Sequence, residues 1–231
     1  MNFDLHGFGT ALLAGTLTTI LLALSSLALG ICLGLLGALA KTSASRPLRW
    51  LGEGYSTLVR GVPELLWVLL IYYGSVGLVG WLGSLVGRPG LALNPFAAGT
   101  LALGLCFGAY ATEVFRGALL AIPRGHREAG LALGLSRARI FWRLVLPQMW
   151  RVALPGLGNL FMILMKDTAL VSVIGLEEIM RHAQIAVSFS KQPFTFYMAA
   201  ACLYLGLTVL SLIAMHYLEK RAGRGFVRAR A

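Results

Sequence analysis

Charged residues are scarce in this chain, and acidic residues are the scarcest. Only 13% of the 231 residues are Asp, Glu, Lys or Arg, whereas a soluble domain has about 25%. Apolar residues make up 58% of the chain, and its mean hydropathy is +0.77. This composition argues against a disordered chain and against a water-soluble enzyme.

Residues that bind metals or carry out nucleophilic catalysis are also few and scattered. The sequence contains no Gly-x-x-x-x-Gly-Lys-Ser/Thr phosphate loop and no Gly-x-Ser-x-Gly nucleophile motif. The three cysteines and four histidines have no metal-ligand spacing: Cys32, Cys106, Cys202, His6, His126, His182 and His216. We therefore predict no catalytic residue and no metal site, so any work that the protein performs needs an outside energy source.

Long apolar runs are what the sequence has in abundance. A hydrocarbon core of about 30 Å requires about 20 mostly apolar residues, and lipid requires that the backbone hydrogen bonds be satisfied internally. We predict an all-α integral membrane protein with one domain, residues 1–231, and five transmembrane helices. The predicted spans are 11–40, 61–84, 95–117, 152–174 and 194–218.

The basic residues are distributed unevenly between the two sides of these spans. Of 20 Lys and Arg residues, 16 lie in the segments 41–60, 116–151 and 220–230, and three lie on the other side. Because basic loops stay in the cytoplasm, this distribution predicts a multi-pass inner membrane protein with an outside N-terminus and a cytoplasmic C-terminus. It also accounts for the net charge of +11 without a nucleic-acid partner.

The loop 118–151 is too charged to span a bilayer and has a regular pattern. We predict a short helix that begins after Pro123 and ends at Gly134, and a second helix capped by Ser136. Pro147 is predicted to break the run before the next span. From pattern alone, this segment is either a compact cytoplasmic knob or a helix that lies on lipid headgroups.

The same loop resembles the EAA loop of ABC-transporter permease subunits. Glu128, Ala129, Gly134 and Leu146-Pro147 stand at the motif positions, whereas Gly130 replaces the second Ala and Leu144 replaces Ile. The resemblance implies that this loop couples the permease to an ATPase subunit, with Glu128 and Gly134 central.

The remainder of the chain resembles the polar amino acid permeases. The matching segments are Arg60-Gly-Val-Pro-Glu-Leu-Leu66, Gly108-Ala-Tyr-Ala-Thr-Glu113 and Lys166-Asp-Thr-Ala-Leu-Val-Ser-Val-Ile-Gly-Leu176. The segment 53–64 is most similar to permeases for histidine, lysine, arginine and ornithine and to their opine relatives.

This resemblance implies the type I ABC importer fold and an import function for polar, chiefly basic, amino acids. A permease for a neutral amino acid or an opine is the alternative. The implied partners are a second permease subunit, two ATPase subunits that bind ATP and Mg, a periplasmic or lipid-anchored solute-binding protein, and membrane lipid.

Three charged residues within the predicted spans are candidates for the substrate path, because a buried charge is costly in lipid. Lys166 and Asp167 are adjacent and point about 100° apart on a helix; they either stabilise helix packing or line the path. Glu64 follows a proline and either starts a helix or is a counter-charge for a cationic substrate.

Other polar residues have structural explanations. Glu113 and Arg116 are three residues apart and are predicted to pair on one helix face. Tyr110 is expected in an interfacial aromatic belt, with a place along the substrate pathway as the alternative. Glu177 and Glu178 are expected to be solvated, with contact to the binding protein as the alternative.

Overall fold

The computed structural model describes residues 7–85 and 92–223, and every regular element within these ranges is helical. The elements are α1 (Gly9–Lys41), α2 (Arg46–Gly61), α3 (Glu64–Leu85), α4 (Pro95–Ala121), α5 (Arg124–Ala132), α6 (Arg137–Ile140), the π-helical η1 (Phe141–Val145), α7 (Leu146–Asp167), the 3₁₀-helical η2 (Thr168–Ile174), α8 (Ile179–Ser190) and α9 (Pro193–Ala222). The protein is therefore an all-α membrane protein, as the composition predicted.

Four helical segments in the described ranges are long and apolar enough to cross a membrane: α1, α4, the continuous helix Arg137–Ile174, and α9. The axes of α2 and α3 differ by 103° at a break around Val62-Pro63, and this bent pair would form a fifth span. The bend follows from the chemistry of proline, which disfavours helical backbone at the preceding residue. The five-span arrangement stays a prediction.

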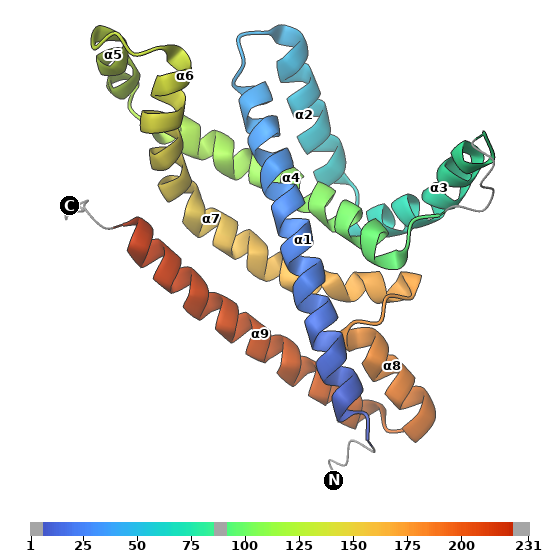
Figure 1. Cartoon of the computed structure of the whole chain (residues 1–231). Coiled ribbons are helices and arrows are strands. Elements are labelled where there is room, and N and C mark those ends of the chain that lie inside the picture. Colours follow the sequence, from blue (N-terminus) through green and yellow to red (C-terminus); the bar gives the residue numbers. More distant parts are fainter. Residues whose placement is uncertain (1–6, 86–91, 224–231) are drawn as a thin grey trace.

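Helices α1 and α4 pack closely against each other, and α1 crosses in front of α4 in Figure 1. A Cβ atom added to Gly34 of α1 would lie 2.6 Å from Ala111 Cβ of α4, and one added to Gly30 would meet Phe107. Small residues at this spacing let two membrane helices approach at backbone distance. The α1–α4 pair forms the centre of the fold, with α7 packed against it.

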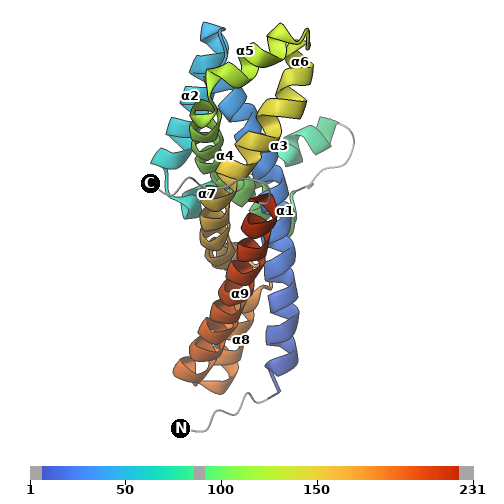
Figure 2. The same cartoon turned by 90° about the vertical axis from the view of Figure 1, so that its left-hand side faces the viewer.

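The two ends of the molecule differ in composition (Figures 1 and 2). At one end lie α5 and α6, the C-terminal end of α1 and the start of α2; at the other lie α8 and the start of α1. The first end includes the basic segments around Lys41–Arg49 and Arg124–Arg143. Two basic loops that are distant in sequence thus share one end of the helix bundle.

The predicted break at Pro147 is wrong. Helices α6, η1 and α7 run continuously from Arg137 to Asp167, so the second half of the predicted loop 118–151 is helical. A π-helical segment explains this outcome: the Leu146 amide donates to the carbonyl of Phe141, five residues earlier. The altered register accommodates Pro147, which has no amide hydrogen to donate.

Candidate functional site

A cavity of about 190 Å³ lies between α3, α4 and α7. Most of its wall is apolar, and two carboxylates, Glu64 and Asp167, line it although they are 103 residues apart in the sequence. The remaining lining residues are Leu103, Cys106, Phe107, Tyr110, Leu160, Ile163 and Leu164. Two acids in an apolar wall create a demand for positive charge.

The local structure explains how Glu64 reaches the cavity. Glu64 is the first residue of α3 and directly follows the bend after Pro63. Its Oε1 accepts a hydrogen bond of 3.2 Å from the hydroxyl of Tyr110 on α4. Tyr110 therefore belongs to the cavity wall, whereas the sequence pattern favoured an aromatic belt. A place along the pathway was the alternative, but the sequence did not indicate Glu64 as the partner, because the contact joins residues 46 positions apart.

The structure separates the adjacent candidates Lys166 and Asp167. Asp167 is the last residue of α7 and lines the cavity with Glu64. Lys166 is exposed and lines a second hollow beside Tyr197 and Tyr204 of α9. Asp167 thus joins Glu64, and Lys166 does not.

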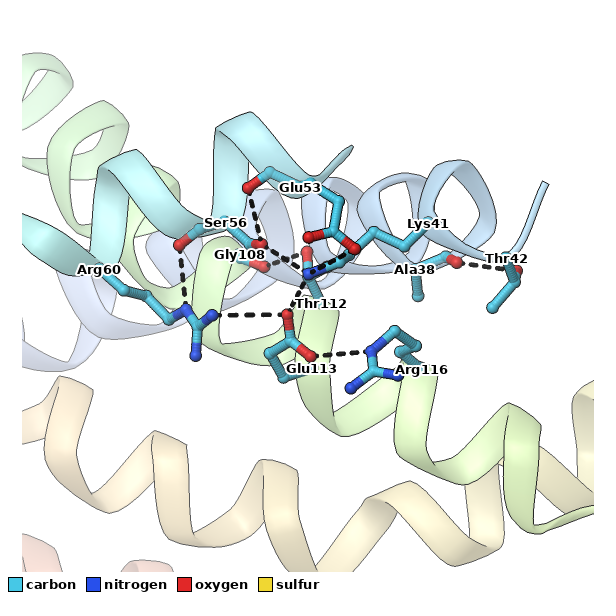
Figure 3. Close-up of polar contacts among 10 residues, drawn as sticks. All are labelled: Ala38, Lys41, Thr42, Glu53, Ser56, Arg60, Gly108, Thr112, Glu113 and Arg116. Atoms are coloured by element: carbon cyan, nitrogen blue, oxygen red, sulfur yellow. Dashed lines mark hydrogen bonds and ion pairs between the residues drawn. The ribbon is translucent and has the colours of Figure 1, made fainter. Parts of the chain in front are cut away.

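A polar cluster joins α1, α2 and α4 (Figure 3). Glu113 of α4 is at its centre, with its Oε2 2.9 Å from Arg116 Nε and its Oε1 2.5 Å from Lys41 Nζ. Arg60 of α2 lies 3.5 Å from Glu113 Oε1, and Lys41 also donates to Ser56 Oγ at 2.9 Å. The sequence predicted the Glu113–Arg116 pair but missed Lys41 and Arg60, because they come from other helices.

This cluster stabilises the position of α2. Lys41 is the last residue of α1, and its side chain is only 6% exposed. A buried ammonium requires a partner carboxylate, and Glu113 is that partner. Since Arg60 is near the end of α2, the same cluster anchors the helix that leads into the bend before Glu64.

The knob at the basic end is built by the turn between α5 and α6. Gly134 has a φ of +70°, a backbone conformation that residues with a Cβ atom rarely adopt. The Gly134 amide donates to the Leu131 carbonyl at 2.9 Å, and the Leu135 amide to the Gly130 carbonyl at 3.0 Å. These two bonds form a Schellman motif, and Ser136 then caps α6 by accepting from the Arg139 amide. The predicted helix end and cap are confirmed.

Gly130, where the EAA pattern has alanine, is required by packing. It is the only buried residue of α5. A Cβ atom at this position would lie 2.9 Å from Ile140 Cγ1 and 3.1 Å from Leu144 Cδ1. The missing methyl group therefore lets α5 lie against α6 and η1, so the departure from the motif makes the knob more compact.

The outer surface of the knob is partly apolar. Leu133 is 79% exposed and Trp142 is 64% exposed, and the motif residues Glu128 and Ala129 are exposed as well. Large apolar side chains exposed on a charged segment are candidates for a protein contact. Leu146 is partly buried and Pro147 is exposed at the base of the knob. The sequence did not indicate Trp142 as a contact residue, because its exposure is visible only in the folded structure.

Glu178 contradicts the expectation that it is solvated. It is fully buried and caps α8: Oε2 accepts from the Met180 amide at 2.9 Å, and Oε1 from the Arg181 amide at 2.8 Å. The Tyr204 hydroxyl donates to Oε2 at 2.7 Å. Burial raises the pKa of Glu178 above its ordinary value, and these hydrogen bonds oppose that rise. Its neighbour Glu177 is exposed.

In the part of the chain that the structure describes, no cluster of His, Cys, Asp and Glu residues is arranged to hold a metal ion. The polar chemistry is instead concentrated in the acidic cavity, the Glu113 cluster and the knob. Membrane helices around a small cavity with two carboxylates in an apolar wall, and a compact knob at one end, are the features expected of a membrane transport permease.

Residues 30–224 match the family described as the inner membrane component of binding-protein-dependent transport systems, and the chain belongs to that family. It is a permease subunit of an ABC transporter and not an enzyme. It is a multi-pass protein of the inner membrane.

Similar proteins span nearly the whole chain. The octopine permease OccQ of Rhizobium meliloti is 44% identical over 99% of this chain and 97% of its own length. The histidine/lysine/arginine/ornithine permease HisQ of Escherichia coli is 41% identical, covering 97% and 99%. The arginine permease ArtQ of Escherichia coli is 42% identical, covering 89% and 92%.

Solved structures share the fold. An amino acid ABC transporter crystallised with histidines has a TM-score of 0.79 and 29% identity, covering 96% of this chain and all of its own. The MetNI methionine transporter in an inward-facing form has a TM-score of 0.76 at 17% identity, covering 94% and 98%, and shows the shared fold alone. The fold is therefore that of an ABC importer permease.

Proposed function

We propose that this permease carries a cationic amino acid, such as arginine, histidine, lysine or ornithine, through the cavity between Glu64 and Asp167. The observation that supports this most directly is the pairing of two carboxylates in an otherwise apolar wall. The HisQ and ArtQ relatives transport basic amino acids by their names. The cavity of about 190 Å³ is smaller than the roughly 300–1,000 Å³ of drug-sized sites, which suits a small solute.

The chemistry of the cavity favours a guanidinium, ammonium or imidazolium group. A carboxylate in a dry wall needs a counter-charge, and an arginine side chain is able to bind two oxygens of one carboxylate at once. Tyr110 orients Glu64 through its 3.2 Å hydrogen bond. Phe107 also lines the cavity, and an aromatic ring is able to attract a cation at its face.

Transport requires coupling to ATP, and we assign that role to the knob. Glu128, Ala129, Gly134, Leu146 and Pro147 would contact an ATPase subunit that itself binds ATP and Mg. We propose an assembly with a second permease subunit, two ATPase subunits and a periplasmic or lipid-anchored solute-binding protein. ATP binding then acts by favouring one of two permease conformations over the other.

The proposed orientation has the N-terminus outside and the C-terminus in the cytoplasm. This orientation places the knob and the basic end of the bundle on the cytoplasmic side, where an ATPase has access to ATP. The uneven distribution of Lys and Arg supports it.

The test is uptake by the complete complex in vesicles with saturating binding protein. Glu64→Gln and Asp167→Asn keep the size and remove the charge, and arginine or histidine uptake should fall at least tenfold while assembly and basal ATPase activity persist. Glu177→Gln, an exposed acid outside the cavity, is the matched control. Unchanged uptake in both cavity variants would exclude the proposed path.

The 44% sequence identity to the octopine permease OccQ supports a second candidate substrate, an opine. The same vesicles separate the candidates when octopine, arginine and a neutral amino acid are each offered with the cognate binding protein. Preferential uptake of octopine would replace the amino acid in the proposal, and preferential uptake of the neutral amino acid would exclude a cationic substrate.

A further inference from the structure

Another cavity lies where the knob meets the ends of the spans. It is separate from the cavity between Glu64 and Asp167 and from the hollow beside Lys166. Its volume is about 670 Å³. One wall is formed by the C-terminal ends of α1 and α4, and the other by α5, α6 and η1. Figures 1 and 2 show these segments together at the basic end of the molecule. The lining residues come from both the membrane spans and the polar knob, so the cavity lies at the boundary between them.

The charged side chains that line this cavity are all positive. Its three charged lining residues are all arginines: Arg124 and Arg127 of α5 and Arg137 of α6. In the described part of the chain, the recorded ion pairs centre on Glu53 and Glu113, and none involves these arginines. Glu128 is on α5 as well but does not line the cavity. Three arginines therefore line this cavity, and no Asp or Glu of the described residues lines it.

The other wall is apolar. Leu39 of α1 and Leu119 and Leu120 of α4 line the cavity, and Leu120 is 66% exposed. Ile140, Phe141 and Val145 continue this surface on the knob side. A ligand that fits both walls has a compact anionic head and an apolar body.

We propose that this cavity binds the phosphate headgroup of an anionic phospholipid from the cytoplasmic leaflet. Arginine binds phosphate oxygens in a planar, two-point geometry, and basic pockets beside transmembrane helices attract anionic headgroups. The acyl chains would lie along the leucines at the ends of α1 and α4. A lipid fits better than free phosphate, because free phosphate gains nothing from the apolar wall. The lipid would brace the knob against the spans.

The test uses the complete, purified complex in detergent and short-chain phosphatidylglycerol as the probe, with binding measured by native mass spectrometry. Arg127→Gln/Arg137→Gln should weaken phosphatidylglycerol binding about 30-fold, which corresponds to about 2 kcal/mol for two arginines near a membrane surface. The matched control is Arg46→Gln/Arg49→Gln, two exposed arginines at the same end that do not line the cavity. The control should bind phosphatidylglycerol as the wild type does.

Four further measurements decide between the occupants. Arg127→Lys/Arg137→Lys keeps the charge and should restore most of the binding, and uncharged phosphatidylcholine should bind poorly. Equal phosphatidylglycerol affinity in wild type and the Gln variant would overturn the proposal. Displacement of phosphatidylglycerol by inorganic phosphate alone would also overturn the proposal. So would an Arg127→Gln/Arg137→Gln complex that loses its ATPase subunit but still binds phosphatidylglycerol, because these arginines would then contact the ATPase and not the lipid.

Discussion

Lys41 and Glu113 are 72 residues apart in the chain, yet their side chains form an ion pair with 2.5 Å between Nζ and Oε1. Lys41 ends α1, and Glu113 is in the middle of the second half of α4. Arg60 and Arg116 flank the same carboxylate, so one acid faces three cations (Figure 3). The pair joins the two central helices, and Arg60 and Ser56 link it to α2, the helix that leads into the cavity of Glu64 and Asp167.

Because one acid faces three cations, we expect substitution of Glu113 to destabilise the protein more than substitution of Lys41. Glu113→Gln leaves Arg60 and Arg116 without their carboxylate and leaves Lys41 with Glu53 alone, 4.0 Å away, so it should lower the free energy of unfolding by up to about 3–5 kcal/mol, the cost of breaking a buried pair. Lys41→Met leaves Glu113 with both arginines and should cost less. Thermal unfolding of the purified complex measures both, with Arg49→Gln as control. A larger loss for Lys41→Met would contradict the central role of Glu113.

The hydrogen bond from Tyr110 to Glu64 predicts a positioning role. Tyr110→Phe keeps the ring and removes the donor, so it should cost about 1 kcal/mol, or about fivefold in the apparent affinity for the transported amino acid. The maximal uptake rate should change little. Uptake at varied substrate concentration in vesicles measures this, with Tyr197→Phe, in the hollow beside Lys166, as control. An unchanged affinity would show that Glu64 does not need this donor.

The turn at Gly134 predicts different results for three substitutions. A Cβ at this position meets no atom within 4 Å, so any cost comes from the backbone conformation and not from a clash. Gly134→Val should cost about 1–2 kcal/mol locally and reduce coupling, whereas Gly134→Asn tolerates a positive φ and should remain close to wild type. Gly134→Asp also tolerates this φ but adds a negative charge at the docking surface, so ATP hydrolysis should be uncoupled from import.

Coupling is measured as amino acid import per ATP hydrolysed in the reconstituted complex. The Asp and Asn variants differ in charge and hardly in backbone preference, so their comparison isolates the electrostatic effect. Wild-type coupling in both the Val and Asp variants would exclude Gly134 from the coupling surface.

The burial of Glu178 predicts a pH dependence with a defined sign. An exposed carboxyl group loses its proton near pH 4.5, whereas burial raises the pKa of Glu178 in the folded protein. The folded state then binds more protons, so the free energy of unfolding falls as the pH rises from 4.5 through the raised pKa. Glu178→Gln should flatten this part of the profile. Thermal unfolding across pH tests it, with the exposed Glu177→Gln as control; equal slopes in wild type and Glu178→Gln would contradict it.

The topology is testable with fusions that are active on only one side of the membrane. A cytoplasm-active reporter after Ala231 and another near Ser43 should both be active, and one near Pro89, outside the described residues, should be silent. The reason is the clustering of Lys and Arg on one side of the spans. A periplasmic signal from the C-terminal fusion would overturn the proposed orientation.

Local features of this protein were predictable from its sequence. Apolar runs indicate membrane helices wherever they occur, because lipid demands apolar side chains and internal backbone hydrogen bonds. The end of α5 at Gly134 and the cap at Ser136 depend only on the backbone freedom of glycine and on a nearby hydroxyl group. The matching motif segments were likewise sufficient to indicate the ABC permease family.

The helix packing determined the rest. The approach of Asp167 to the cavity of Glu64 and the burial of Glu178 against Tyr204 depend on groups outside the local segment. The helix continues through Pro147 by a local π-helical hydrogen bond, which the usual four-residue helical pattern does not anticipate. The sequence itself shows the charge of each side chain and the apolar run around it. It was therefore enough to identify Glu64 and Asp167 as charges whose burial in lipid is costly. Which partner offsets that cost depends on which helices pack together, and that is decided by the tertiary structure.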